Sequence, residues 1–363
     1  MQSEDEVHIQ RCIELAKFAI GKTSPNPYVG CVITIDGRVV SEGYHKMSGS
    51  PHAELDAINK AKESLSGSTV YTNLEPCCHT NKKTPPCAQR LIKEGVSKVV
   101  VGSLDPNPLV AGKGIKILKD AGIEVTVGVL KEKCDKLNEV FFKHIIEKRP
   151  FIHLKWAQTL DGKVATKAYS SKWITNDLAR LYSHKERNLY DAILVGSNTL
   201  NKDDPSLTIR VDEQILSKKR IILSNTGEVN LDSKLFNDEF KEQTVLVIPN
   251  SLDRTFNNIN TLKVNTIDNK IDLVDLMKSL YNLNVKSIYV EGGAKVINSF
   301  LTQKLFDRVS AFIAPKLIGE GISVSDNLKK LEMNEAHVFE SAVWTIINNN
   351  ILLESSENIC LQD

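Results

Sequence analysis

The fold and chemistry of this chain are decided by Pro51-His52-Ala53-Glu54, Glu75-Pro76-Cys77-Cys78-His79 and Pro85-Pro86-Cys87. One histidine and two cysteines supply the three protein ligands of a catalytic zinc site, which leaves its fourth position to water. Zinc lowers the pKa of that water to about 7, and a carboxylate that does not bind the metal then moves the proton. Glu54 comes two residues after His52, at the start of an expected helix, and this position suits that role.

This His-x-Glu and Pro-Cys pattern is the signature of zinc deaminases, whose second half usually reads Pro-Cys-x-x-Cys. Here Cys77 and Cys87 are ten positions apart, which departs from the usual spacing. A structural site with four ligands, the fourth from Cys78 or His79, is the alternative interpretation. The position of Glu54 favours the catalytic site, because a structural site does not need a carboxylate there. We therefore predict zinc ligands at His52, Cys77 and Cys87.

Outside these segments, apolar patterns predict helices alternating with strands. Asp36-Gly37 between two apolar runs is a strong hairpin signal. The alternation is interrupted at Glu147-Lys148-Arg149-Pro150 and then restarts, and 363 residues exceed what a single core usually holds. We therefore expect two α/β domains, 1–147 and 148–363. The expected helices are 9–20, 52–65, 85–94, 115–121 and 271–280, and the expected strands are 28–35, 38–41, 69–74, 98–102, 123–129, 151–157, 192–196, 220–224, 245–249, 287–290, 309–313 and 343–354.

The composition points to an ordinary globular protein with a small-molecule partner. A net charge of +1 gives no reason to expect nucleic-acid binding. The sequence has no apolar stretch long enough to span a membrane, and its start, Met1-Gln2-Ser3-Glu4-Asp5-Glu6, is acidic, unlike a signal peptide. We therefore expect a cytoplasmic protein without a membrane partner. In that reducing compartment, a cluster of cysteines indicates metal binding rather than disulfides.

The first 147 residues resemble the deaminase half of the bacterial deaminase–reductase of riboflavin biosynthesis, which has a cytidine-deaminase-like α/β/α sandwich. In that family the first cysteine ligand follows Glu-Pro, which indicates Cys77. The family usually has eight residues between its two cysteines, and this chain has nine. Cys78 would restore that spacing and is the alternative, although loop insertions are easily tolerated. The matching segments are Pro25-Asn26-Pro27-Tyr28-Val29-Gly30, Gly43-Tyr44-His45, Pro51-His52-Ala53-Glu54, Leu74-Glu75-Pro76-Cys77, Thr84-Pro85-Pro86-Cys87, Asp105-Pro106-Asn107-Pro108 and Gly112-Lys113-Gly114.

The resemblance also implies the side chains that bind the substrate in this half. An amide can hydrogen-bond the edge of an aminopyrimidine, and a lysine or histidine can bind a ribose phosphate. An ordinary role is the alternative for each, such as a turn residue at Asn26 or a solvated surface group at Lys83. The implied residues are Asn26, His45, His79, Lys83, Asp105 and Asn107.

The second half offers one local signal of its own, the turn Glu291-Gly292-Gly293-Ala294 after an apolar strand. Glycines between a strand and a helix let backbone N–H groups approach a phosphate, although many such turns are purely structural. The usual dinucleotide fingerprint, Gly-x-Gly-x-x-Gly, is absent. The residues alone therefore leave a nucleotide site and a structural turn both open.

From about Arg149 onward the chain resembles the reductase half of the same enzyme, whose fold is similar to dihydrofolate reductase. The matching segments include Leu154-Lys155-Trp156-Ala157 and Asp203-Asp204-Pro205-Ser206-Leu207-Thr208-Ile209-Arg210. Arginine and lysine suit a ribosyl phosphate, because guanidinium offers bidentate donors. We expect Lys155 and Glu291 to polarise the open sugar carbonyl and handle its proton. The other implied substrate contacts come from Ser171, Arg187, Leu207 and Arg210.

The same resemblance implies an NADPH site, in which the nicotinamide carries out hydride transfer and the protein supplies position and electrostatics. Trp173 is the least specific member of this site, because a tryptophan is more often part of a core than a cofactor platform. The implied cofactor-binding residues are Ala157, Trp173, Thr199, Asp203, Ser224, Gly293, Ala294 and Lys295.

We therefore expect a bifunctional enzyme of riboflavin biosynthesis. Zinc-dependent hydrolysis would deaminate 2,5-diamino-6-(5-phosphoribosylamino)pyrimidin-4-one, and NADPH would then reduce the ribosyl side chain to ribityl phosphate. A homo-oligomer, either a dimer or a tetramer, is also expected. Two alternatives are a deaminase acting on a nucleic-acid base, as in transfer-RNA editing, and a non-enzymatic structural zinc domain joined to a nucleotide-binding module. The near-neutral charge and the attached reductase argue against the first alternative.

Overall fold

The computed structural model describes residues 2–78, 86–108, 110–211, 214–326, 328 and 332–356. By its internal contacts the chain divides into two units, Met1–Lys148 and Arg149–Asp363. Each unit has its own sheet flanked by helices, so the expected α/β fold class is confirmed. None of the helices in the described ranges is both long and apolar enough to cross a membrane.

The sheet of the first unit starts with the predicted hairpin, β1 (Gly30–Ile35) and β2 (Arg38–Tyr44). Asp36 and Gly37 have φ values of 49° and 75°, the left-handed conformation that such a two-residue turn requires. The strand order is β2-β1-β3-β4-β5, with β3, β4 and β5 parallel. Parallel strands place their carboxyl ends at one edge of the sheet. The remaining strands are β3 (Thr69–Leu74), β4 (Lys98–Ser103) and β5 (Glu124–Val127).

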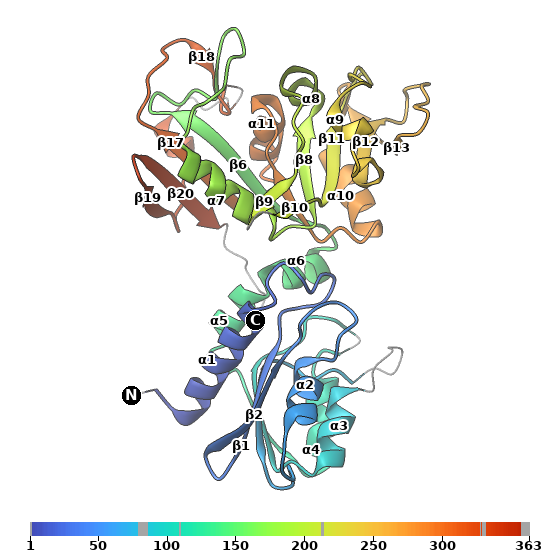
Figure 1. Cartoon of the computed structure of the whole chain (residues 1–363), viewed down its shortest axis with the longest axis vertical. Helices are drawn as coiled ribbons and strands as arrows, with labels where there is room; N and C mark the ends of the chain where they lie inside the picture. The colour runs from blue at the N-terminus through green and yellow to red at the C-terminus, as the bar shows by residue number, and fades with distance from the viewer. Residues whose placement is uncertain are drawn as a thin grey trace. The chain divides into compact units, whose positions relative to one another are not determined.

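Helices cover both faces of this sheet, as Figure 1 shows. One apolar cluster joins α2, α3 and α4 to one face, and a second joins α1 and α5 to the other. The unit is therefore an α/β/α sandwich. Its helices are α1 (Glu4–Lys17), α2 (Ala53–Lys60), α3 (Cys87–Glu94), α4 (Lys113–Asp120), α5 (Lys131–Leu137) and α6 (Glu139–Glu147).

Two predicted helices end earlier than expected. The first is shifted, since it begins at Glu4 and ends at Lys17, and the second ends at Lys60, with Ala61 already in an extended conformation. Leu65 still packs in the same apolar cluster as the helix, although it lies beyond the helix end. An apolar residue in an irregular segment thus imitated the helical period. The helices α5 and α6 had no prediction.

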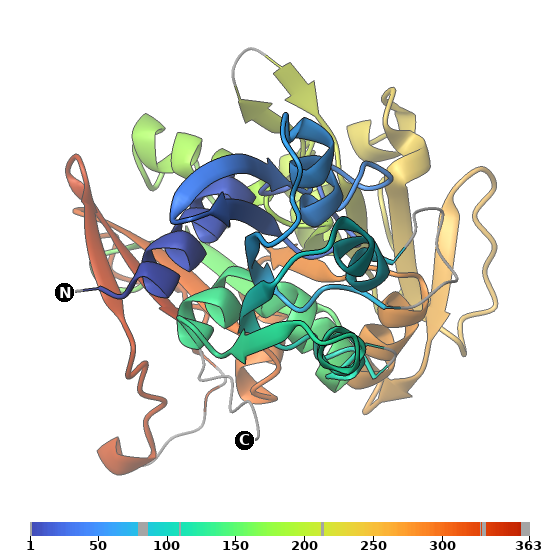
Figure 2. The same ribbon diagram turned by 90° about the horizontal axis from the view of Figure 1, so that it is seen from below.

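The second unit contains a nine-stranded sheet in the order β13-β12-β11-β8-β16-β6-β17-β20-β19. Its first seven strands are parallel, and β20 and β19 continue it as an antiparallel hairpin. The β19–β20 hairpin and β13 lie at opposite ends of the sheet (Figure 2). The predicted strand over 343–354 is therefore two strands with a turn between them. The strands are β6 (Phe151–Thr159), β8 (Ala192–Gly196), β11 (Lys219–Leu223), β12 (Thr244–Pro249), β13 (Asn260–Val264), β16 (Ser287–Val290), β17 (Arg308–Ala314), β19 (Val343–Ile347) and β20 (Asn350–Ser356).

Helices again cover both faces of the sheet. The helices α10 and α11 pack on one face, and α7, α8 and α9 contribute to apolar clusters on the other. Three pairs of short strands lie outside the main sheet, and of these β9 (Ile209–Val211) contacts α7. The helices are α7 (Asp177–Arg187), α8 (Ser197–Asp203), α9 (Lys234–Asn237), α10 (Leu273–Asn282) and α11 (Ala294–Thr302), and the other short strands are β7 (Ala165–Thr166), β10 (Gln214–Leu216), β14 (Thr266–Ile267), β15 (Lys270–Ile271) and β18 (Gly321–Ile322).

Candidate active sites

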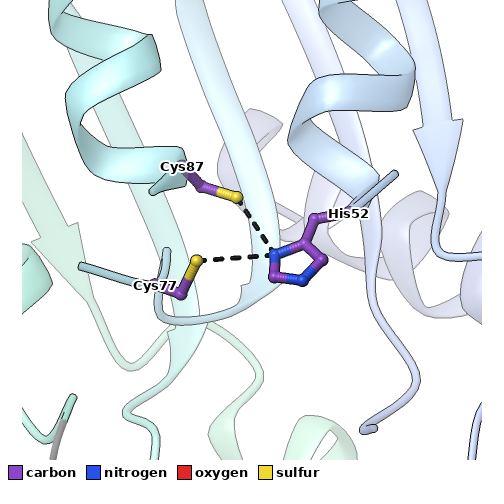
Figure 3. Close-up of side chains that lie close together, drawn as sticks. All are labelled: His52, Cys77 and Cys87. Atoms are coloured by element: carbon purple, nitrogen blue, oxygen red, sulfur yellow. Dashed lines mark hydrogen bonds between the residues drawn. The ribbon is translucent and has the colours of Figure 1, made fainter. Parts of the chain in front are cut away.

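The three predicted zinc ligands converge from separate elements of the first unit (Figure 3). His52 is the N-cap of α2, Cys77 follows β3, and Cys87 is the first residue of α3. The Nδ1 atom of His52 lies 3.4 Å from Sγ of Cys77 and 3.3 Å from Sγ of Cys87. Nitrogen and sulfur ligands of a tetrahedral zinc ion lie ~3.6 Å apart, given bond lengths of ~2.0 and ~2.3 Å. The donor set and its spacing therefore fit zinc.

The two predicted cysteine ligands interact with each other, and their pKa values move in opposite directions. Hydrogen bonding with Cys87 lowers the pKa of Cys77 to about 4, although burial opposes the shift. The same hydrogen bond raises the pKa of Cys87 well above its ordinary value, so Cys87 donates to the Cys77 thiolate. Cys78 is not part of this three-residue group within the described ranges, and burial raises the pKa of its thiol. The position of the Cys77 Sγ atom in this group therefore favours Cys77 over Cys78 as the ligand.

Glu54 lies in the first turn of α2 beside the cluster, and it is only 3% exposed. Burial raises the pKa of its carboxyl group, while the charge of His52 opposes that shift. The Glu54 side chain hydrogen-bonds Cys87 and so reaches the ligand cluster directly. A buried carboxyl group that reaches the ligand cluster is placed to act as a general acid and base.

Two predicted substrate residues, Asn26 and His45, form a hydrogen-bonded pair next to the cluster. Nδ2 of Asn26 lies 3.0 Å from Nε2 of His45, and Nδ1 of His45 lies 3.0 Å from the carbonyl oxygen of Pro51. An amide nitrogen only donates, so Nε2 accepts and the proton of the neutral ring is on Nδ1. The rings of His45 and His52 are 5.6 Å apart. The structure therefore places this pair beside the first zinc ligand.

Asp105 and Asn107 lie in the loop after β4, at the same sheet edge as Cys77. Oδ1 of Asp105 accepts a hydrogen bond of 2.8 Å from the backbone N–H of Asn107. The loop is held by Glu75, whose carboxylate accepts backbone hydrogen bonds from Asp105 (3.3 Å), Gly112 (2.9 Å) and Ile115 (3.2 Å). The sequence analysis missed this role, although Glu75 belongs to the Glu-Pro-Cys motif. The predicted substrate residues His79 and Lys83 lie outside the described residues.

In the second unit the structure brings Lys155, Arg187 and Glu291 together. Arg187 binds both carboxylate oxygens of Glu291, with Nη2 2.9 Å from Oε2 and Nε on Oε1. Nζ of Lys155 lies 3.6 Å from the same Oε2 atom. Burial alone would raise the pKa of Glu291, but the two cations lower it to about 2. Glu291 is therefore a carboxylate held between two positive charges.

The other predicted substrate residues of this unit lie around α7. Arg210 is on β9, and Ser171 is in the loop that leads into α7. The side chain of Leu207 is 4% exposed and packs in an apolar cluster, so a substrate contact there would use its backbone. His184 was missed: its Nδ1 lies 3.4 Å from Nη1 of Arg187, and burial together with Arg187 lowers its pKa to about 4. The sequence feature that could have indicated His184 is its position one helical turn before Arg187.

Thr199, Ser224 and Gly293, three of the predicted cofactor residues, lie just beyond the carboxyl ends of parallel strands. The start of α8 follows β8, and the start of α11 follows the neighbouring strand β16. A Cβ atom at Gly293 would lie 3.1 Å from Oγ1 of Thr199, so the two helix starts approach closely. No side chain caps the N-terminus of α11, which fits a phosphate group bound by backbone N–H groups. The remaining residues are Asp203 on α8, Ser224 after β11, Ala294 and Lys295 on α11, Ala157 on β6, and Trp173, which is 63% exposed.

Two known protein families match the chain, one over each unit. Residues 2–103 match the cytidine and deoxycytidylate deaminase zinc-binding region. Residues 150–347 match the RibD C-terminal domain. The first match contains the whole His52, Cys77 and Cys87 cluster, and the second contains Lys155, Arg187 and Glu291.

Individual relatives resemble the chain over most of its length. The riboflavin biosynthesis protein RibD of Aquifex aeolicus is 44% identical over 323 residues, which cover 89% of this chain and 90% of the relative. The Escherichia coli RibD is 36% identical over 343 residues, which cover 90% and 93%.

Solved structures show the same similarity. The RibD of Acinetobacter baumannii has a TM-score of 0.87 at 34% identity and covers 97% of this chain and 98% of that one. A diaminohydroxyphosphoribosylaminopyrimidine deaminase/5-amino-6-(5-phosphoribosylamino)uracil reductase of Thermotoga maritima has a TM-score of 0.84 at 36% identity, with 98% and 99% covered. The chain therefore belongs to the RibD family: it is a bifunctional enzyme of riboflavin biosynthesis that joins a zinc-dependent deaminase to an NADPH-dependent reductase.

Proposed function

We propose that the first unit deaminates 2,5-diamino-6-(5-phosphoribosylamino)pyrimidin-4-one, with His52, Cys77 and Cys87 as the zinc ligands. The observation that carries this proposal is the convergence of the three donor atoms within 4.8 Å of one another. When bound, zinc would supply an activated water as the nucleophile. Glu54, buried and in contact with Cys87, would take a proton from that water and deliver one to the leaving ammonia.

The pyrimidine ring would be held by the side chains that surround the cluster. Asn26 and His45 support each other, and Asp105 and Asn107 lie on the loop held by Glu75. Amide and carboxylate groups can read the donor and acceptor pattern of an aminopyrimidine. We assign the ribose phosphate of the substrate to His79 and Lys83 on the strength of the family motif.

In the second unit, the ribosyl group would be reduced at Lys155, Arg187 and Glu291. When bound, NADPH would supply the hydride for C1′ of the ribosyl group. The ring oxygen released from C1′ would then take a proton. Lys155 is the candidate donor of this proton, since its ammonium group lies at the site and pairs with Glu291 at 3.6 Å. Arg187 and Arg210, with Ser171 and the backbone of Leu207, would hold the substrate and its phosphate.

Residues at the carboxyl ends of β11, β8 and β16 would hold NADPH. The N–H groups at the start of α11, from Gly293 to Lys295, would bind a phosphate, and Thr199 lies against that turn. The other assigned contacts are Ala157, Trp173, Asp203 and Ser224. The cofactor carries the redox chemistry, so these residues act by position.

Ammonia release tests the deaminase assignment directly. Wild type and Glu54→Gln are loaded with zinc to the same content and given the diaminopyrimidine ribosyl phosphate without NADPH. We expect the wild type to release ammonia and the variant to lose about 10²- to 10⁴-fold in rate while it keeps its zinc. A fully zinc-loaded wild type without activity on this compound, but active on cytosine or adenine in RNA, would reverse the substrate assignment.

The cytoplasm as location and a homo-oligomer as assembly belong to the same proposal. A phosphorylated substrate and NADPH are both metabolites of that compartment. Cell fractionation and analytical ultracentrifugation of the purified chain test the two points separately. A single sedimenting species with the mass of one chain would contradict the homo-oligomer.

A further inference from the structure

A buried polar network lies on the face of the second sheet that α7 covers. His153 of β6 is paired with Tyr289 of β16, and the next residue on the same face of β6, Lys155, is paired with Ser310 of β17. Successive side chains of a strand alternate between faces, so these four residues share one face. His153, Tyr289 and Ser310 are buried, and they lie beside Lys155 of the reductase site.

The hydrogen bonds of this network converge on the carboxylate of Glu186 in α7. Its carboxylate accepts hydrogen bonds from Tyr289 (2.7 Å, to Oε2) and from Ser310 (3.1 Å, to Oε1). Because Ser310 donates to Glu186, its oxygen accepts from Nε2 of His153 at 2.9 Å. Nδ1 of His153 then accepts from the hydroxyl of Tyr190 at 2.5 Å. Three of these donors form one chain, from Tyr190 through His153 and Ser310 to Oε1 of Glu186, and Tyr289 donates separately to Oε2.

Two adjacent residues of α7, Glu186 and Arg187, each bind a residue at the end of β16. Glu186 binds Tyr289, and Arg187 binds Glu291, which is two residues further along. A displacement of α7 at Glu186 would therefore move Arg187 and its contact with Glu291.

Opposing interactions determine the pKa of the Glu186 carboxyl group. Its side chain is 9% exposed, and burial raises the pKa of its carboxyl group to about 7. The carboxylate of Glu354 raises it as well, while the hydrogen bond from Tyr289 and the charge of Lys155 lower it. His153 remains neutral, since burial lowers its pKa to about 3. The titratable groups that face Glu186 include His153 and Lys155 from β6, Tyr289 from β16, Glu354 from β20 and Tyr182 from α7 itself.

We propose that Glu186 is a positioning residue of the reductase site, and that its ionised form holds α7 and the end of β16 in the arrangement that Lys155, Arg187 and Glu291 need. Protonation removes one acceptor position and forces the chain of donors to reverse, which loosens this arrangement. The reductase therefore gains activity with rising pH as Glu186 ionises. This inference rests on the proposed assignment of the reductase site.

The test compares Glu186→Gln, Tyr289→Phe and Glu354→Gln with wild type in the full chain. The kcat for NADPH oxidation with the deaminated substrate is measured from about pH 6 to about pH 8.5. We expect wild type to show a rise centred near neutral pH, and Glu186→Gln to be flat and about 5-fold slower at the upper end. The rise should move to higher pH in Tyr289→Phe, which loses a donor, and to lower pH in Glu354→Gln, which loses a repelling charge.

Infrared titration of the protonated carboxyl band provides a second measurement that needs no turnover. A band that titrates near neutral pH in wild type and is missing in Glu186→Gln supports the inference, even if the substrate assignment fails. Ammonia release by the first unit and the variant Glu239→Gln, an exposed glutamate in the same unit, serve as controls. The inference is overturned if Glu186→Gln keeps the wild-type pH profile, or if it slows turnover equally at every pH. Absence of NADPH oxidation by wild type would instead refute the reductase assignment.

Discussion

Lys155 lies on β6, and Glu291 follows the neighbouring strand β16. Their Nζ and Oε2 atoms are 3.6 Å apart. Replacement of Lys155 by Met keeps the length of the side chain but removes the charge and the proton donor. We expect kcat for NADPH oxidation to fall about 100-fold or more, while ammonia release by the other unit is unchanged. Unchanged NADPH oxidation in Lys155→Met would show that another group donates the proton.

Zinc content distinguishes the two adjacent cysteines. Cys77→Ser and Cys87→Ser each remove a ligand, so both should purify with less than one tenth of the wild-type zinc, roughly, and without deaminase activity. Cys78→Ser is the matched control and should keep both. Metal analysis of the purified proteins measures this directly, and zinc lost from Cys78→Ser but kept in Cys77→Ser would reverse the assignment.

Glu75 should matter for substrate binding rather than for zinc. Glu75→Gln leaves one amide oxygen to accept hydrogen bonds from Asp105, Gly112 and Ile115, and its NH₂ group faces donors. The loop that carries Asp105 and Asn107 should then lose its fixed position. We expect KM for the deaminase substrate to rise about 10-fold with zinc content unchanged. A variant that instead loses zinc would indicate that Glu75 supports Cys77.

The free energy of unfolding of the second unit should also depend on the charge of Glu186. Its folded pKa of about 7 lies above the ordinary value of 4.5, so the folded unit binds more protons between these values and loses stability as pH rises. This loss of folding stability is complete above about pH 7 and absent below about pH 4.5. We expect Glu186→Gln to be about 1–3 kcal/mol more stable than wild type at high pH, with the difference shrinking in acid. Urea titrations at several pH values measure this, and a constant difference would contradict it.

The sequence predicted the zinc ligands but not the residues that hold the two sites in place. The residues His52, Cys77 and Cys87 stand in a pattern that zinc chemistry requires, and that pattern is visible without a structure. Glu75 and Glu186 act through partners far along the chain, so no local spacing marks them. The helix α7 had no prediction because its buried face includes the polar residues Ser183 and Glu186, which give no apolar period.

The boundary between the two units has a consequence for the gene. The helix α6 ends at Glu147, and Arg149 already forms a bidentate pair with Asp307, 2.7 Å from Nη1 to Oδ2, inside the second unit. Only Lys148 separates the last helix of one unit from this anchor of the other. Two open reading frames, divided after codon 148, should therefore each encode a polypeptide that folds by itself. A bacterium that lacks one of the two steps could then be complemented by half of this gene.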